Sequence, residues 1–193
     1  MRLFELFDKP LDYKLMSTRT DANHGEKDYT YGFRVDDYWY KVYVSFYPML
    51  SLMDEENIRG KSLAEIVPPE FVEQAEQYKL VMSIDFGQFD YTEKTVPVRG
   101  KIPWGAGEER TGREGTGNEL QVFATVSQIG QEMYNKYRDS IGAIEFGVKQ
   151  SDPNRKRLYN TLMRKFGITG KTRFEFDIDT VDGEIQDRVV IVL

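Results

Sequence analysis

The chain has 193 residues, of which 40% are apolar and 13% aromatic, enough to build the core of one compact domain. Its net charge of −6 disfavours a protein that grips a nucleic-acid backbone, and the absence of cysteine excludes disulfides, thiolate metal sites and cysteine nucleophiles. No apolar run reaches membrane-spanning length, and Glu5 and Asp8 interrupt any signal-peptide pattern, so we expect a cytoplasmic protein.

The first part of the chain predicts a loop and then a β-hairpin. Residues 17–28 are polar and predict a loop. Residues 29–35 and 38–47 alternate in hydropathy on either side of Asp36 and Asp37, which indicates two antiparallel strands. The second strand has two different faces. One carries Trp39, Lys41, Tyr43, Ser45 and Tyr47, and the other carries Tyr40, Val42, Val44 and Phe46. The first of these faces is either a binding surface or an aromatic layer packed under a neighbouring element.

The next stretch predicts two helices, a strand and a long loop. Residues 54–66 and 69–80 have helical patterns separated by adjacent prolines, and Pro69 suits a first helical turn. Residues 83–91 alternate as a strand, with a possible bulge at Gly87. Residues 100–117 contain six glycines and predict a long loop, a kind of segment that is either functional or mobile.

The stretch from 119 to 167 organises the prediction. Alternating apolar residues over 120–126 favour a half-buried strand, and the stripe Ile129, Met133 and Tyr137 favours a short helix after it. Residues 144–148 alternate again and predict a second strand. We expect the two strands to be parallel neighbours joined by the intervening helix.

A last helix and a closing hairpin complete the predicted domain. Ser151 or Asp152 can cap a helix whose inner face carries Tyr159, and Gly167 supplies its stop. Residues 172–179 and 188–193 then read as strands, the second buried on both faces. The fold class expected is α+β, a mixed and largely antiparallel sheet flanked by helices, in one domain over residues 1–193.

Three motif-like features do not predict sites. Gly170, Lys171 and Thr172 resemble the end of a phosphate-binding loop, but the helix precedes them and the strand follows, which is the reverse of the real motif. Asp177 and Asp179 lack the glutamate that closes a calcium loop. The single histidine, His24, lies in a loop-like segment without metal-ligand partners, so no metal site is predicted.

The order of predicted elements resembles that of the GNAT acetyltransferases, and residues 143–168 are similar to the later half of that family's core. The resemblance implies a role for Tyr159 as the general acid that protonates the departing thiolate of coenzyme A. It also places Ser127, Gln128 and Gly130 at the cofactor pyrophosphate, with Asn154 close by. The turn at 126–131, however, has one glycine and no basic residue, and Asp152 replaces the family's asparagine.

A broader resemblance, over residues 7–13, 115–126, 155–159 and 164–166, is to a group of tailed-bacteriophage proteins with a GNAT-like ending. It implies a phage protein located in the virion or the host cytoplasm. We therefore expect a non-enzymatic protein without a cofactor, which binds a phage or host protein rather than a membrane or nucleic acid. The alternative is an acetyl-CoA-dependent N-acyltransferase. The expected contact residues are Trp39 and Tyr43 on the hairpin, and Trp104, Arg110 and Arg113 in the long loop.

Overall fold

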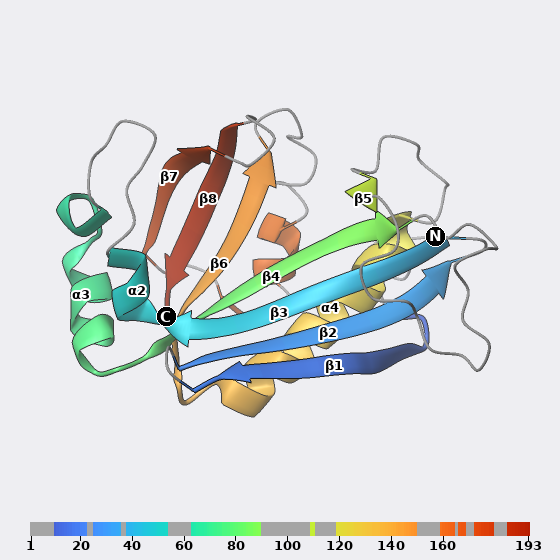
Figure 1. The fold of residues 1–193 in the computed structure, drawn as a ribbon. Coiled ribbons are helices and arrows are strands. Elements are labelled where there is room, and N and C mark those ends of the chain that lie inside the picture. The colour runs from blue at the N-terminus through green and yellow to red at the C-terminus, as the bar shows by residue number, and fades with distance from the viewer. Residues whose placement is uncertain are drawn as a thin grey trace.

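A computed structural model shows one sheet that runs through the molecule, with helices on both of its faces (Figure 1). The structure describes residues 10–22, 25–35, 38–53, 63–89, 109–110, 119–149, 159–164, 166–168, 172–179 and 185–193. The strands are β1 (Tyr13–Asp21), β2 (Glu26–Val35), β3 (Tyr38–Pro48), β4 (Leu80–Phe89), β5 (Glu109–Arg110), β6 (Ile141–Lys149), β7 (Arg173–Asp179) and β8 (Ile185–Val192). The helices are α2 (Met49–Met53), the 3-10 turn η1 (Leu63–Glu65), α3 (Pro69–Glu76), α4 (Glu119–Tyr137) and a helical segment over residues 159–164.

The sheet has two antiparallel parts joined by one parallel pair. Its order is β1-β2-β3-β4-β6-β8-β7, and β5 pairs with β4 beside this path. The pairs within β1–β4 and within β6–β8–β7 are antiparallel, whereas β4 and β6 are parallel. The fold is therefore α+β with a mixed, mostly antiparallel sheet, as the sequence predicted.

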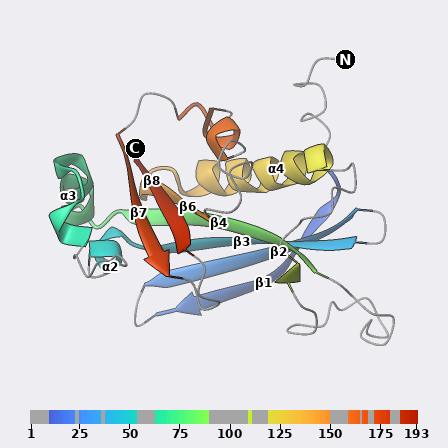
Figure 2. The same ribbon diagram turned by 90° about the horizontal axis from the view of Figure 1, so that it is seen from above.

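Two hydrophobic clusters lie on opposite faces of this sheet. The larger one includes Val44, Ile84 and Ile144 and packs against α4 and the segment 159–164, which both cover the same face (Figure 2). The smaller one joins α2 and α3 to Val81, Ala143 and Val190 on the opposite face. Strand β8 contributes to both clusters, Val189 and Ile191 to one and Val190 and Val192 to the other. This confirms that the closing apolar strand is buried on both faces.

The predicted strand over 120–126 is wrong. These residues belong to α4, which continues without a break to Tyr137. Val122, Val126, Ile129 and Met133 are buried at helical spacing. Since no strand exists there, the parallel neighbour of β6 is β4, and the expected turn at 126–131 lies within the helix.

Other boundaries also differ from the prediction. The polar segment 17–28, predicted to be a loop, is mostly strand, because β1 continues to Asp21 and β2 begins at Glu26, and the two strands pair as a hairpin. A helix was expected over 54–66, and the structure describes only the end of this range, which contains the short turn η1. Helix α2 ends at Met53, just before the predicted range begins. The bulge at Gly87 is wrong, since β3 and β4 pair in continuous register from Trp39–Phe89 to Pro48–Leu80.

The helix predicted over 69–80 is shorter than expected, because α3 ends at Glu76 and β4 begins at Leu80. The remaining predicted elements are confirmed where the structure describes them, with boundaries that differ by a few residues. Strands β2 and β3 form the expected hairpin, and β7 and β8 form the closing one. Gly167 ends the segment 159–164 with a φ of +72°, and the Ile168 amide donates to the Met163 carbonyl at 2.9 Å. This is the hydrogen-bond pattern that terminates many helices at glycine.

Candidate functional site

The sheet opens between β4 and β6. The two strands pair from Leu80–Ile141 to Ser83–Glu145, and beyond that point β4 continues to Phe89 while β6 continues to Lys149. A diverging parallel pair exposes backbone amides and carbonyls on its inner edges, and such groups need partners when they are buried. We call this region the β4–β6 gap. It is the place in the sheet where an extended ligand could pair with the backbone.

Tyr159 fills the gap on the side of α4. Its ring stacks on Phe146 of β6 at 4.5 Å between centroids and meets Phe86 of β4 at 6.2 Å. Its hydroxyl donates to the Ile84 carbonyl at 3.4 Å, just past the last residue of β4 that pairs with β6. The side chain is 2% exposed. Tyr159 therefore bridges the two diverging strands as part of the core.

The rest of the β4 edge has partners from this same chain. The Asp85 carboxylate accepts a hydrogen bond from the Phe86 amide at 2.8 Å. Further along, Gln88 and Phe89 pair with Arg110 and Glu109 of β5. Because β3 occupies the other edge of β4 over this whole length, β5 lies on the gap side. The gap-side edge of β4 is thus covered in turn by β6, Tyr159, Asp85 and β5.

A polar cluster of Tyr47, Glu145 and Arg188 lies on the opposite face, at the base of the gap. The Arg188 guanidinium donates to Glu145 Oε1 from Nε at 2.6 Å, and its Nη2 donates to the Tyr47 hydroxyl at 3.1 Å. The Tyr47 hydroxyl in turn donates to Glu145 Oε2. Burial raises the pKa of the Glu145 carboxyl, and the Arg188 charge opposes this rise. The three side chains connect β3, β6 and β8.

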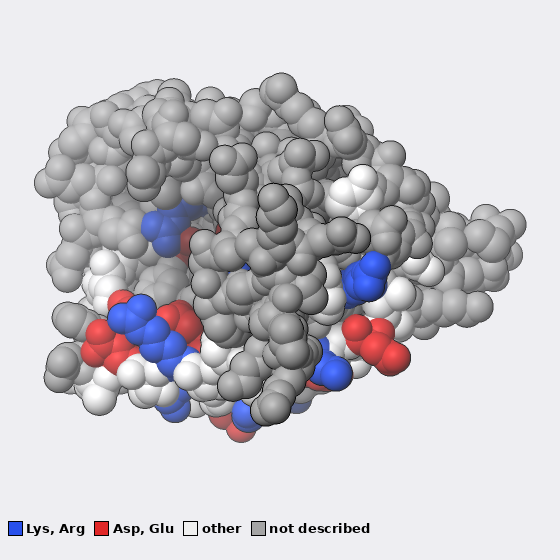
Figure 3. Space-filling view, turned by 45° about the vertical axis from the view of Figure 1, so that its right-hand side comes forward, with Lys and Arg blue, Asp and Glu red and all other residues white. Residues whose placement is uncertain are grey.

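Two of the predicted contact residues lie on this same face of the sheet. In Figure 3, which is turned by 45° from the view of Figure 1, basic and acidic side chains lie close together at this side of the molecule. Tyr43 lies on the same face as Tyr47, since the two are four residues apart on β3, and it pairs across the sheet with Thr30 and Asp85. Trp39 is on this face as well, and both Trp39 and Tyr43 are half-buried. These two predicted contact residues are therefore on the face that carries the polar cluster.

The three residues expected at a pyrophosphate lie in the interior of α4. Ser127 and Gly130 are buried, and Gln128 is exposed and donates to Glu132 at 2.9 Å. A Cβ added at Gly130 would lie 2.8 Å from Phe166 Cζ and 3.0 Å from Ile84 Cδ1. Gly130 thus allows α4 to approach the core closely. Backbone amides in a helix interior donate within the helix, so they are not available to an anion as those at an N-terminus are.

Several predicted residues fall outside the described part of the chain. These are Trp104, Arg113 and Asn154, together with the side chain of Arg110, whose backbone is in β5. The sequence analysis also missed Glu145 and Arg188. A signal for them was present, because each is a charged residue within or beside an apolar strand, and such residues are rarely buried without a partner.

Comparison with models of known protein families, with curated proteins and with solved structures gave no match. Within the described residues, no helix is both long and apolar enough to cross a membrane. The same residues contain no group of three or more histidine, cysteine or acidic side chains placed to hold a metal ion.

Proposed function

We propose that this chain is a non-enzymatic protein of a tailed bacteriophage, on a GNAT-like scaffold, which binds a protein of the virion or of the host. The GNAT-like part of the proposal is supported by the order of elements. An antiparallel set of strands leads through a helix to a parallel strand, which diverges and is followed by a helical segment and a closing hairpin. The phage origin is supported by the sequence resemblance of residues 7–13 and 115–126.

The observation that carries the non-enzymatic role is the occupied edge of β4. In GNAT enzymes the coenzyme enters between the diverging strands, and its amide-bearing arm would need the backbone groups of β4 as partners. Here Tyr159 uses the Ile84 carbonyl and Asp85 uses the Phe86 amide, while β5 covers the end of the strand. A ligand would have to displace all three. The continuous α4 also lacks the helix N-terminus that would hold a pyrophosphate at residues 126–131.

The alternative function, acetyl-CoA-dependent N-acyl transfer, has one observation in its favour. The Tyr159 hydroxyl lies at the gap, where a general acid for a departing thiolate would be needed. In that role the hydroxyl would turn away from the Ile84 carbonyl toward the sulfur.

Calorimetric titration of the full chain with coenzyme A and with acetyl-CoA separates the two functions. We expect no binding at micromolar concentrations. A Kd of about 1 μM, or roughly −8 kcal/mol, that is weakened in Tyr159→Phe would establish the acyltransferase instead. Asn135→Ala is the matched control, because this side chain is exposed on α4 and lies outside the turn at 126–131 that the GNAT resemblance assigns to the cofactor.

Purification of the tagged chain from infected cells, with mass spectrometry of purified virions, tests the protein-binding role directly. We expect one phage or host protein to co-purify in stoichiometric amount, and Tyr43→Ser to reduce its recovery. Leu15→Ser is the control, since Leu15 is an exposed apolar residue on β1. Recovery of the chain alone, both from cells and from virions, would contradict the proposal.

A further inference from the structure

The turn that follows α3 has an unusual residue. Tyr78 has a φ of +57°, in the left-handed region that favours glycine. Its amide donates to the Ala75 carbonyl at 2.9 Å, and the Lys79 amide donates to the Gln74 carbonyl at 3.3 Å. The segment 159–164 ends in the same pattern, with Gly167 at the equivalent position. The end of α3 thus carries a bulky aromatic residue where the backbone conformation favours glycine.

Tyr78 is also strongly exposed, and other apolar side chains near it are exposed as well. Its exposed fraction is 84%, against 43% for Leu50 and 38% for Ile66. Among the large apolar side chains that are exposed in the described residues, only Leu15 lies outside this end of the molecule. The Met49 amide at the start of α2 donates to the carbonyl of Lys79, in the segment after α3, at 3.0 Å. Leu50 and Tyr78 are the chain neighbours of these two residues, so they lie on either side of this hydrogen bond.

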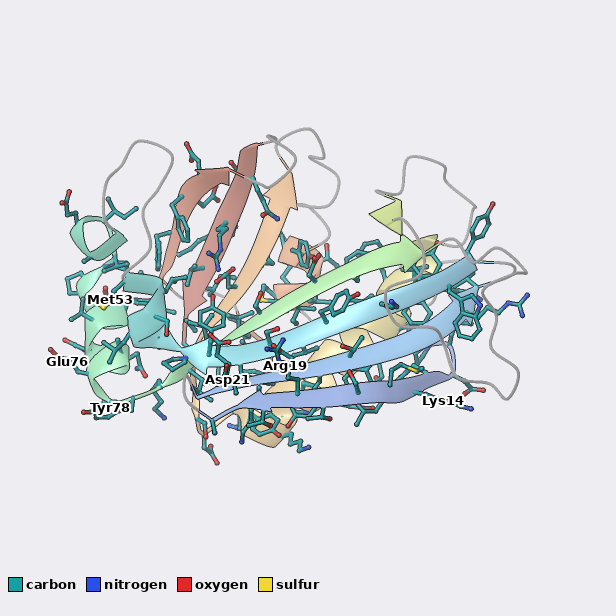
Figure 4. The ribbon with its side chains drawn as sticks, viewed as in Figure 1. Lys14, Arg19, Asp21, Met53, Glu76 and Tyr78 are labelled. Carbon is teal, nitrogen blue, oxygen red and sulfur yellow. The ribbon has the colours of Figure 1, made fainter. Side chains whose placement is uncertain are left out.

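The outer face of α3 is acidic. Glu70, Glu73 and Glu76 follow one another at a spacing of three residues and are all exposed, while Phe71 and Ala75 face the core. Figure 4 shows Glu76 and Tyr78 at the outer end of the helix, directed away from the sheet. Like charges at this spacing destabilise a helix, and a glutamate in the last turn opposes the helix dipole. The nearby Lys79 ammonium donates to the Asp139 carbonyl.

We propose that this surface, formed by Leu50, Glu70, Glu73, Glu76 and Tyr78 and called here the α3 surface, binds a basic and partly apolar segment of a partner protein. Charge complementarity selects the partner, because a row of carboxylates attracts lysine and arginine. Tyr78 offers an exposed ring on which an arginine side chain can stack, and Leu50 offers apolar contact. A nucleic acid or an acidic membrane would be repelled by the same carboxylates. The inference rests on the protein-binding role proposed above and adds the chemistry of the partner.

Fluorescence anisotropy with a labelled peptide of alternating arginine and leucine tests the proposal on the full chain. We expect Glu73→Gln/Glu76→Gln to weaken binding about tenfold at low salt. The control Asp12→Asn/Glu175→Gln removes two exposed carboxylates elsewhere, giving the same net charge. It should change affinity by less than about twofold. Equal losses in the two double variants would show attraction by net charge alone and would overturn the proposal.

Tyr78→Gly provides a second and independent test, because stability and binding should change in opposite directions. Glycine relieves the left-handed backbone, so the melting temperature should rise by about 2 °C. Loss of the exposed ring should weaken peptide binding about fivefold. Unchanged affinity in this variant would remove Tyr78 from the binding surface and overturn the proposal. Coenzyme titration does not involve the α3 surface, so a failure of this inference can be distinguished from a failure of the proposed function.

Discussion

Gly130 shows how one residue can suggest two different roles. In the sequence it stands in a segment that resembles a pyrophosphate-binding turn, where glycine would let backbone amides approach an anion. In the structure it lies in the middle of α4, against Phe166 and Ile84. The absence of a side chain therefore serves packing between the helix and the core.

Gly130→Ala should destabilise the protein even though alanine is the better helix former. The gain in helix propensity is about 1 kcal/mol. The added Cβ would meet a buried ring at 2.8 Å, and such overpacking costs about 1 to 3 kcal/mol. We expect a net loss of about 1 kcal/mol by urea denaturation. Gln128→Ala, on the exposed side of the same helix, should stay within about 0.5 kcal/mol of the wild type. An increase in stability for Gly130→Ala would show that this contact relaxes freely.

Tyr159 could be assigned from the sequence to a helix, but not to a role. The spacing of Tyr159, Leu162 and Phe166 fits the inner face of a helix whether or not the tyrosine acts in catalysis. The structure decides its surroundings, because the ring is stacked on Phe146 and the hydroxyl is directed to the Ile84 carbonyl. Those contacts join elements far apart in the chain, and a single sequence does not predict them.

At the scale of elements, the errors have physical causes. Val122, Ala124 and Val126 alternate as in a strand, but Val122, Val126, Ile129 and Met133 also form a helical stripe. A short apolar run fits both periods, and only the length of the whole element separates them. Strand β1 was missed because it is an edge strand with few apolar residues, and it is held mainly by backbone pairing with β2. Strands rich in apolar residues, such as β6 and β8, were predicted correctly.

The end of the segment 159–164 gives a prediction at the same scale. Gly167 has a φ of +72°, and a Cβ added there would meet no atom within 4 Å. Gly167→Ala should therefore cost about 1 kcal/mol through backbone strain alone. Chemical denaturation would measure this loss, with Arg164→Ala on the exposed side of the same segment as the control. A loss of much more than this would indicate that the segment rearranges.

For the molecule as a whole, the joint between the two parts of the sheet is narrow. Strands β4 and β6 pair at four positions, and the polar cluster of Tyr47, Glu145 and Arg188 lies across the same joint. The sequence predicted strands β4 and β6 but not their pairing, because that pairing depends on which strands become neighbours in the folded sheet. A buried ion pair is not in itself evidence of stability, because desolvation opposes the attraction between its charges.

A double-mutant cycle measures what the cluster contributes. Arg188→Met should cost about 3 kcal/mol or more, because it leaves the Glu145 carboxyl buried without its counter-charge. Glu145→Leu should have a similar cost, because it leaves the Arg188 guanidinium without its carboxylate partner. The combined variant should be at least about 2 kcal/mol more stable than the sum of the single losses implies. Additive losses in urea denaturation would show that the two side chains act independently.

The position of β8 has a consequence for the order of assembly. This strand follows β7 in the chain, yet it lies between β6 and β7 and contributes to both hydrophobic clusters. A nascent chain that has emerged only as far as residue 184 contains β6 and β7 but not β8, the strand that lies between them in the sheet. During synthesis on the ribosome, closure of this side of the sheet must therefore be a late event. Until then the unpaired edges of β6 and β7 are the places where chaperones, or a neighbouring nascent chain, would bind.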